Sequence, residues 1–248
     1  MRASLICVVA CVASFGATPS ASAAEPCTAP NLRGHVATFW FVPDAHPRVH
    51  FSDAPGGPPN KKYVVRGDLL LVNQRTATSV CASYVRRSPG RHLALEVVAV
   101  GWIEKSALTR FDLVDFGSFD VDPPRDLKAA NAALSALAKA LPSVADWRGR
   151  WVNRDKDEVT IWKKGPRFEL SLMGLAGAVG TGNRDEDSRA LSTAGAKAWI
   201  KEDPKVDDVC DVVIVGFNNA LLATSGAHCL GSGANHTYPQ FTGIYWKK

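Results

Sequence analysis

A histidine and a cysteine stand side by side late in the sequence, and this pair could do covalent chemistry. His228 directly precedes Cys229, and Asp211 lies earlier in the same part of the chain. An imidazole that accepts the thiol proton turns the thiolate into a nucleophile, and a carboxylate can orient the imidazole. The pair requires a free thiol, so its meaning depends on the redox compartment of the protein.

Two other histidines have a spacing that binds zinc on a helix. His46 and His50 are four residues apart, but Pro47 lies between them and the segment RVHF that follows is typical of a strand. Extended chain does not present the two imidazoles as a helix would. We therefore expect no metal site here.

Two polar clusters further along also fail to match a cofactor site. Gly177, Gly180 and Gly182 have the order Gly-x-x-Gly-x-Gly, which is wrong for a dinucleotide fingerprint. The acidic run at residues 185–187 lacks the alternating oxygen ligands of a calcium loop. Both clusters indicate exposed loops, and we predict neither a cofactor nor a catalytic residue.

The first 24 residues have the pattern of a bacterial secretory signal. An early arginine precedes the apolar run LICVVACVASFGA, and the small residues SASAA follow it. The alternative, a membrane anchor, would need about 20 apolar residues. We expect cleavage near Ala23 or Ala24, a periplasmic or secreted protein, and no transmembrane segment after cleavage.

Cleavage of this signal would leave an even number of cysteines. An exported chain with four cysteines favours two disulfides, and three pairings are open. Pairing within each half of the chain is favoured if the chain has two independent domains. The four residues are Cys27, Cys81, Cys210 and Cys229.

The charge of the chain is mildly basic and scattered. Lys and Arg total 29 against 24 for Asp and Glu, which gives a formal net charge of +5. The basic pairs are dispersed along the chain, as solvated loops and strand ends usually are. Together with export, this argues against nucleic-acid binding.

The elements that position these side chains are mainly strands. Residues 31–108 alternate short apolar runs such as HVATFWFV, LLLV and LALEVVAVGWI with clusters of Gly, Pro and Asn, which are strand and hairpin signals. Strand signals return in residues 147–248, in EVTIW, RFELSL, VCDVVIVGF, ALLAT and QFTGIYWKK. The second region is predicted to form a β-sandwich or a small barrel.

A single amphipathic helix is expected between the two β regions, over about residues 123–141. Its apolar residues repeat at spacings of three and four, and Pro142 would end it. A coiled coil would need more heptads than this segment has. The apolar face comprises Leu127, Ala130, Leu134, Leu137 and Leu141.

The first β region resembles the bacterial SH3-like domain of exported proteins, and this resemblance implies a small β-barrel. In order, it has a Tyr strand with a Gly-Asp turn, a strand with an aromatic residue, and a Gly-Trp-Ile strand that runs into a short turn ending in a buried leucine. The glycine before the tryptophan would let a neighbouring strand approach, and the indole would fill a small core. The matching residues are Tyr63, Gly67, Asp68, Tyr84, Gly101, Trp102, Ile103 and Leu108.

The C-terminal region is similar to the last domain of uncharacterised exported bacterial proteins that follow such modules. Phe241, Gly243 and Tyr245 carry this resemblance, which implies a β-barrel-like domain with a Cys-Cys bridge and no chemistry. The chain is therefore divided into a signal (1–24), an SH3-like domain (25–110), a helical linker (111–146) and a C-terminal β domain (147–248).

A ligand surface is expected near Trp40 and Tyr63. Phe39, Trp40 and Phe41 are consecutive, and neighbouring side chains on a strand point to opposite faces. If the two phenylalanines face inward, Trp40 faces outward and could hold a sugar or peptide with Tyr63. The alternative places Trp40 beneath the linking helix, against Leu134 and Leu137.

These patterns and resemblances imply a non-enzymatic exported protein that binds at the bacterial cell envelope. Its expected partner is peptidoglycan, another glycan or an envelope protein. One alternative is an inhibitor or immunity-type protein directed against a secreted cell-wall hydrolase. The other is an envelope hydrolase that uses the Cys/His chemistry described above.

Overall fold

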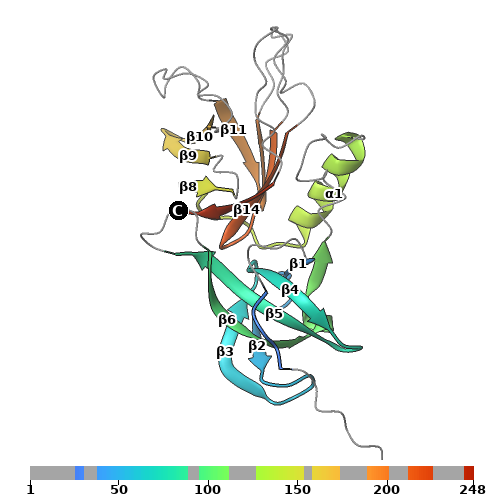
Figure 1. Cartoon of the computed structure of the whole chain (residues 1–248). Coiled ribbons are helices and arrows are strands. Elements are labelled where there is room, and N and C mark those ends of the chain that lie inside the picture. Colours follow the sequence, from blue (N-terminus) through green and yellow to red (C-terminus); the bar gives the residue numbers. More distant parts are fainter. Residues whose placement is uncertain are drawn as a thin grey trace, which may run out of the picture.

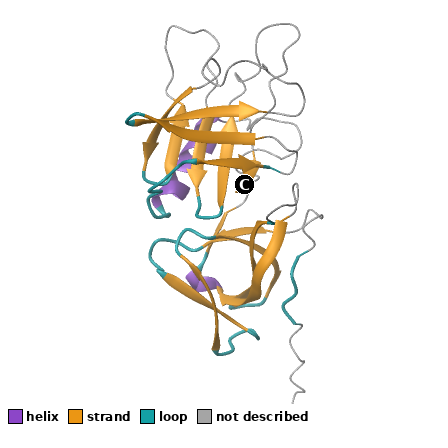
Figure 2. Ribbon diagram, turned by 90° about the vertical axis from the view of Figure 1, so that its left-hand side faces the viewer, coloured by secondary structure: helices purple, strands orange, loops and turns teal. Residues whose placement is uncertain are grey.

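The protein is mainly β, and in a computed structural model the described residues form a curled sheet, one helix and a closed barrel (Figures 1 and 2). The barrel lies above the sheet in Figure 1, with the helix against one side of the barrel. The structure describes residues 26–30, 38–88, 95–111, 127–153, 158–173, 189–200, 212–225 and 243–248.

The N-terminal sheet has seven strands in the order β3-β2-β6-β5-β4-β1-β7. Register shifts occur in the β2–β3, β4–β5 and β5–β6 pairs, and such bulges bend strands and increase their twist, which curls the sheet. Pairing among the described residues leaves β3 and β7 at opposite edges, so the small barrel expected here is only half formed. The strands are β1 (Thr38–Phe41), β2 (Arg48–Ser52), β3 (Pro59–Val65), β4 (Leu69–Arg75), β5 (Ser79–Arg87), β6 (Leu95–Glu104) and β7 (Thr109–Phe111), with a 3-10 turn (Lys105–Ala107) before β7.

The C-terminal barrel has eight antiparallel strands, each paired with its neighbours in sequence, and β15 closes it onto β8. Of the two expected architectures, a sandwich or a barrel, the barrel is therefore present. Strands β8, β11 and β12 were not predicted. The strands are β8 (Gly149–Val152), β9 (Glu158–Lys164), β10 (Arg167–Met173), β11 (Arg189–Ala194), β12 (Lys197–Ile200), β13 (Val212–Gly216), β14 (Ala220–Ser225) and β15 (Gly243–Lys247).

Helix α1 spans Leu127–Lys139 and packs on the outside of the barrel at β12 and β13. It ends slightly before the predicted residue 141, because Ala140 N bonds to Leu137 O and Leu141 N to Ala138 O in a tightened last turn before Pro142. The predicted first turn lies outside the described residues. Leu134, Leu137 and Leu141 are buried, as the periodicity predicted.

Strand β13 shows why the C-terminal apolar runs are continuous. Val212 and Ile214 point into the barrel, while Val213 and Val215 point outward into a second core. That second core lies between the N-terminal sheet, α1 and the barrel. Because both faces of β13 are covered, its sequence loses the alternation of a half-buried strand. We call this second core the shared core.

The turn between β13 and β14 fixes the sheet to the barrel. The side-chain oxygen of Asn219 accepts a hydrogen bond from Leu69 N (2.9 Å), and its Nδ2 donates to Leu69 O (3.1 Å) and Val85 O (3.0 Å). The preceding Asn218 donates from N to Gly67 O (2.9 Å). Asn219, which belongs to the barrel, thus forms hydrogen bonds with backbone groups of the N-terminal sheet.

The expected Gly-Asp turn is present between β3 and β4. Gly67 has a left-handed φ of 85°, which favours glycine, and Asp68 Oδ2 accepts from Val65 N (2.8 Å). Asn218 Nδ2 donates to Asp68 Oδ1 (2.9 Å). Burial raises the pKa of Asp68, against the opposing effect of these two hydrogen bonds.

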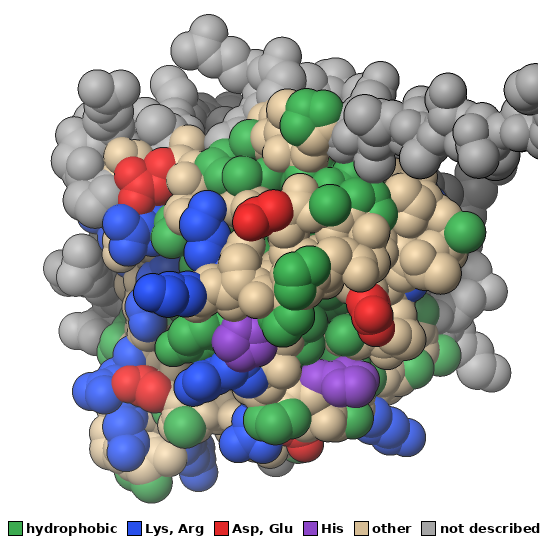
Figure 3. Space-filling model, turned by 90° about the horizontal axis from the view of Figure 1, so that it is seen from below, with side chains coloured by type: hydrophobic (Ala, Val, Ile, Leu, Met, Phe, Trp, Pro, Cys, Tyr) green, Lys and Arg blue, Asp and Glu red, His purple; other side chains and the backbone are tan. Residues whose placement is uncertain are grey.

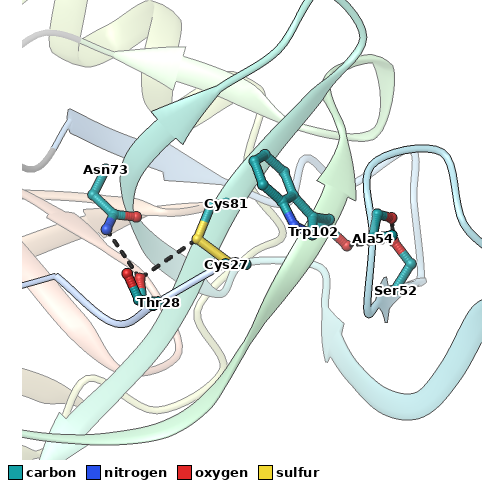
Figure 4. Close-up of a disulfide and its surroundings, with 7 residues drawn as sticks. All are labelled: Cys27, Thr28, Ser52, Ala54, Asn73, Cys81 and Trp102. Carbon is teal, nitrogen blue, oxygen red and sulfur yellow. Dashed lines mark hydrogen bonds between the residues drawn. A yellow bond between two sulfur atoms is a disulfide. The ribbon is translucent and has the colours of Figure 1, made fainter. Parts of the chain in front are cut away.

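Gly101 confirms the reason given for the glycine of the Gly-Trp pair, whereas the Trp102 indole does not fill the core of the N-terminal sheet. A Cβ on Gly101 would lie 3.0 Å from both Phe51 Cβ and Ser52 O, so the glycine allows β2 to approach closely. Trp102 is 3% exposed and lies opposite Cys81 on the adjacent strand (Figure 4). Val80, Ala82 and Ile103 point into the core of this sheet, so Trp102 is buried on its other face, on the side of the disulfide.

Candidate ligand-binding surface

The outer face of the β2–β3 hairpin presents the aromatic and basic side chains of the candidate site. Val49, Phe51 and Val64 point into the core of the N-terminal sheet. His50 and Tyr63 are opposite each other in the register and are both exposed. The alternation of inward and outward residues therefore places them on the solvent side.

Tyr63 is the centre of this surface, with 47% of the residue exposed. The guanidinium carbon of Arg48 lies 4.2 Å from the centroid of its ring, and the His50 ring lies 5.7 Å away. A guanidinium over a tyrosine ring is a cation–π contact, which holds the Arg48 group against Tyr63. We call Arg48, His50 and Tyr63 the Tyr63 surface.

The orientation of His50 is fixed by the turn beside it. His50 Nδ1 lies 3.0 Å from the carbonyl oxygen of Asn60, so Nδ1 donates and Nε2 is left for other partners. The Asn60 side chain donates to Asp53 Oδ1 (2.9 Å) and accepts from Lys62 N (2.8 Å). These hydrogen bonds within the hairpin thus hold the His50 ring so that its Nε2 is available to a partner at the surface.

The charge around Tyr63 is positive. Arg48 and Lys61, which share the outer face of the hairpin with Tyr63, are exposed and form no ion pair with any described residue. Arg66 pairs with Asp44 at 3.2 Å. Figure 3 shows basic and histidine side chains gathered around apolar ones on this lower face. The arrangement favours an acidic ligand with a flat or apolar part.

Trp40 lies on the other side of the sheet from Tyr63, and the predicted orientation of β1 is reversed. The indole is 7% exposed, belongs to the inner core with Val42, and donates from Nε1 to Thr38 Oγ1 (3.1 Å). Phe41 instead points into the shared core. The reason is that both faces of β1 are covered. Trp40 faces the core inside the curled sheet, and Phe39 and Phe41 face the shared core on the other side. A ligand contact by Trp40 would require the indole to leave the core.

The cysteines bear out the predicted pairing in the N-terminal half. A disulfide joins Cys27 to Cys81 and fastens the segment before β1 across β5 (Figure 4). The Asn73 side chain donates to Thr28 O (2.9 Å) beside it. Cys210 and Cys229 lie outside the described residues, as do His228 and Asp211 of the proposed nucleophile group.

Other sequence candidates lie only partly within the described residues. The glycine cluster, the acidic run at 185–187 and Phe241 lie outside the described residues, whereas Gly243 begins β15 and Tyr245 points into the barrel. Within the described ranges, no group of three or more His, Cys, Asp or Glu side chains could hold a metal ion.

Arg48 and the role of His50 were missed by the sequence reasoning. His50 was considered only as a metal ligand with His46. The segment RVHF alternates polar and apolar residues, which would have placed Arg48 and His50 on one face. That alternation is the signal that could have found them.

No helix in the described part of the chain is long and apolar enough to cross a membrane. Comparison with protein-family profiles, with curated proteins and with solved structures finds no match to this chain.

Proposed function

We propose that this chain is a non-enzymatic, exported binding protein of the bacterial cell envelope, and that peptidoglycan is its ligand. The observation that carries the proposal is the Tyr63 surface, where an exposed aromatic ring lies beside an unpaired guanidinium and an imidazole. The signal-like N-terminus supports export, and the Cys27–Cys81 disulfide fits an oxidising compartment.

Peptidoglycan has the chemistry that this surface would recognise. Its stem peptides carry carboxylates, which pair with guanidinium and ammonium groups. Its sugar rings have apolar faces, which can pack on an exposed tyrosine. Arg48 already covers one face of Tyr63, so a sugar or peptide would pack against the free part of the ring while a carboxylate binds the guanidinium.

The finer assignment of the N-terminal sheet to the SH3-like class belongs to the same proposal. The Gly67-Asp68 turn, the Gly101 approach and the buried Trp102 and Leu108 are the features that support it. In this assignment the Tyr63 surface replaces the groove between Trp40 and Tyr63, because Trp40 is buried.

A sacculus pull-down tests the proposal. Tyr63→Ala should lower the affinity of the mature protein for purified sacculi about fivefold to tenfold, because it removes the packing surface and releases Arg48. Arg75→Ala, which removes an exposed arginine at the end of β4, is the matched control and should bind like the wild type.

Two results would contradict the proposal. Equal binding by wild type and Tyr63→Ala would exclude the surface, and catalytic release of soluble fragments from sacculi would indicate a hydrolase. Binding that fell with rising salt in the wild type but not in Arg48→Ala would confirm that a guanidinium–carboxylate pair contributes.

A further inference from the structure

The outer edge of strand β3 presents main-chain groups beside the Tyr63 surface. Among the described residues, β3 pairs with β2 on one side only and ends the sheet (Figure 1). A strand at the edge of a sheet offers its unpaired N–H and C=O groups to another extended chain. The direction of each backbone group along β3 decides which of them can do so.

The register of the β2–β3 hairpin shows that the backbone groups of Tyr63 point away from β2. Arg66 N donates to Pro47 O (3.4 Å), so these two residues form a hydrogen-bonded pair. Such pairs alternate with non-hydrogen-bonded pairs along antiparallel strands. Val49 and Val64 are then the next hydrogen-bonded pair, and the pair that contains Tyr63 is not hydrogen-bonded. The N–H and C=O of Tyr63 therefore face the free edge.

Val65 gives an independent check of this direction. It lies two residues after Tyr63, so its N–H and C=O point to the same side of the strand. The Val65 N–H donates to Asp68 Oδ2 (2.8 Å), and its carbonyl accepts from Asp68 N (3.0 Å), both outside the pairing with β2. No hydrogen bond joins the N–H or C=O of Tyr63 to another described residue. The turn thus satisfies Val65 and leaves Tyr63 with a free donor and a free acceptor.

The length and charge of this edge restrict what can pair with it. Pro59, which begins β3, has no N–H, and Asp68 occupies the other end, so the free edge is short. Arg48 and Lys61 carry positive charge on the adjoining face and form no ion pair with a described residue. A second copy of the strand would bring like charges together. The edge therefore favours a short acidic peptide over a second copy of this chain.

The hairpin does not neutralise its own positive charge. Asp53 is the one acidic residue in the sequence from 48 to 65, and its Oδ1 accepts from Asn60 Nδ2 (2.9 Å). Arg48 lies over the Tyr63 ring through the face of its guanidinium, so its N–H groups can still donate to a carboxylate. A main-chain donor and acceptor and a guanidinium are thus available to one peptide.

We propose that the edge of β3 binds the stem peptide of peptidoglycan as a short added strand, so that the peptide and not the sugar is recognised. This inference rests on the function proposed above and names the part of the ligand that is bound. The L-alanine that begins the stem donates from its N–H to Tyr63 O and accepts at its C=O from Tyr63 N. The glutamate that follows is linked onward through its γ-carboxyl group, and its free α-carboxylate pairs with Arg48 or Lys61.

Titration of the mature protein with N-acetyl-L-alanyl-D-glutamate γ-methylamide, followed by NMR of isotope-labelled tyrosine amides, tests this edge. The Tyr63 amide peak is the one lost in Tyr63→Phe. The ligand should shift that peak saturably, with a Kd on the order of millimolar for so small a molecule. N-methylation of its alanine removes the donor to Tyr63 O, and an amide in place of its α-carboxylate removes the charge. Each change should weaken binding about fivefold to tenfold.

Two arginine variants separate the edge from general electrostatic attraction. Arg48→Met should weaken binding of the dipeptide about fivefold, whereas Arg75→Met, which removes an exposed charge at the end of β4, should change the Kd less than about twofold. No shift at Tyr63, equal affinity for the N-methylated or the amidated ligand, or equal losses in the two variants would each overturn the inference. Tighter binding of N-acetyl-L-Ala-L-Glu-L-Ala amide would overturn it in favour of an acidic segment of a protein.

Sacculi distinguish a failure of this inference from a failure of the proposed function. An amidase that removes the stem peptides leaves the glycan strands, and these should retain less than about a fifth of the protein that intact sacculi retain. Equal retention by both would overturn the assignment to the stem peptide and leave the proposed function standing. No retention by intact sacculi would overturn the proposed function, and this inference with it.

Discussion

Two aromatic clusters in this protein differ in what surrounds them. Phe41, Phe111 and Phe217 meet in the shared core, where the Phe111 and Phe217 rings stack with centroids 5.8 Å apart. Tyr63 has its neighbours, His50 and Arg48, on the next strand of the same hairpin and lies in solvent. The first cluster joins distant parts of the chain, and the second is local. A change in the first should therefore affect the whole fold, whereas a change in the second should affect only the surface.

The largest effect is expected at Phe217, which carries the barrel into contact with the sheet. Phe217→Ala should lower the free energy of unfolding by about 3–5 kcal/mol, through lost burial and the cavity left behind. Denaturant unfolding followed by circular dichroism and by tryptophan fluorescence measures this loss. Because the core is shared, the two probes should give one coincident transition.

Phe217→Leu is the matched control for this substitution. It keeps an apolar side chain in the same position and should cost less than about 1.5 kcal/mol. Two separate transitions in either variant would mean that the sheet and the barrel unfold independently, and would contradict the interpretation of the shared core as a single unit.

An intermediate effect is expected at Asn219, whose side chain bonds to Leu69 and Val85 across the junction. Asn219→Ala leaves those buried backbone groups without partners and should cost about 2–3 kcal/mol. The exposed Asn218 is the comparison: its Nδ2 donates to Arg66 O and to the buried Asp68 carboxylate, and Asn218→Ala should cost about 1–2 kcal/mol, less than Asn219→Ala. Thermal melts of the two variants measure the difference, and equal losses would show that burial of the bonds does not matter here.

The smallest effect on stability is expected at Tyr63. Removal of an exposed ring and of its contact with Arg48 should change the free energy of unfolding by less than about 1 kcal/mol. The same denaturant experiment checks this value. A loss as large as that of Phe217→Ala would mean that the Tyr63 surface is structural, and the reduced binding expected of Tyr63→Ala would then reflect unfolding.

The strands that could be predicted are those rich in β-branched and aromatic residues. EVTIW and RFELSL alternate clearly, and Val159, Ile161 and Leu170 do point into the barrel. Strands β11 and β12 were missed because RALSTA and KAWI contain alanine, serine and lysine, which have weak strand propensity. They form in the barrel because pairing with β10 and β13 satisfies their backbone groups.

The candidate site could be predicted only in part. Tyr63 was identified as a ligand residue, and the structure places it in solvent, but its expected partner Trp40 is buried. Alternation along β1 shows that Trp40 and Phe41 point to opposite faces, but it does not tell which face is inside. Both faces of β1 are covered, so the choice depends on the barrel and on α1.

The sequence by itself determined the β-rich character, the helical period between the two β regions, the Gly-Asp turn and the even number of cysteines after the predicted signal. These features follow from local propensities, from periodicity and from the cysteine count. All three can be read from the sequence without knowing which distant residues are in contact. Only the tertiary structure decided the pairing of Cys27 with Cys81, the closure of the barrel, the direction of Trp40 and the shared core. Each of these depends on contacts between residues far apart in the chain, such as Asn219 with Leu69, and single-sequence patterns do not encode which distant surfaces meet.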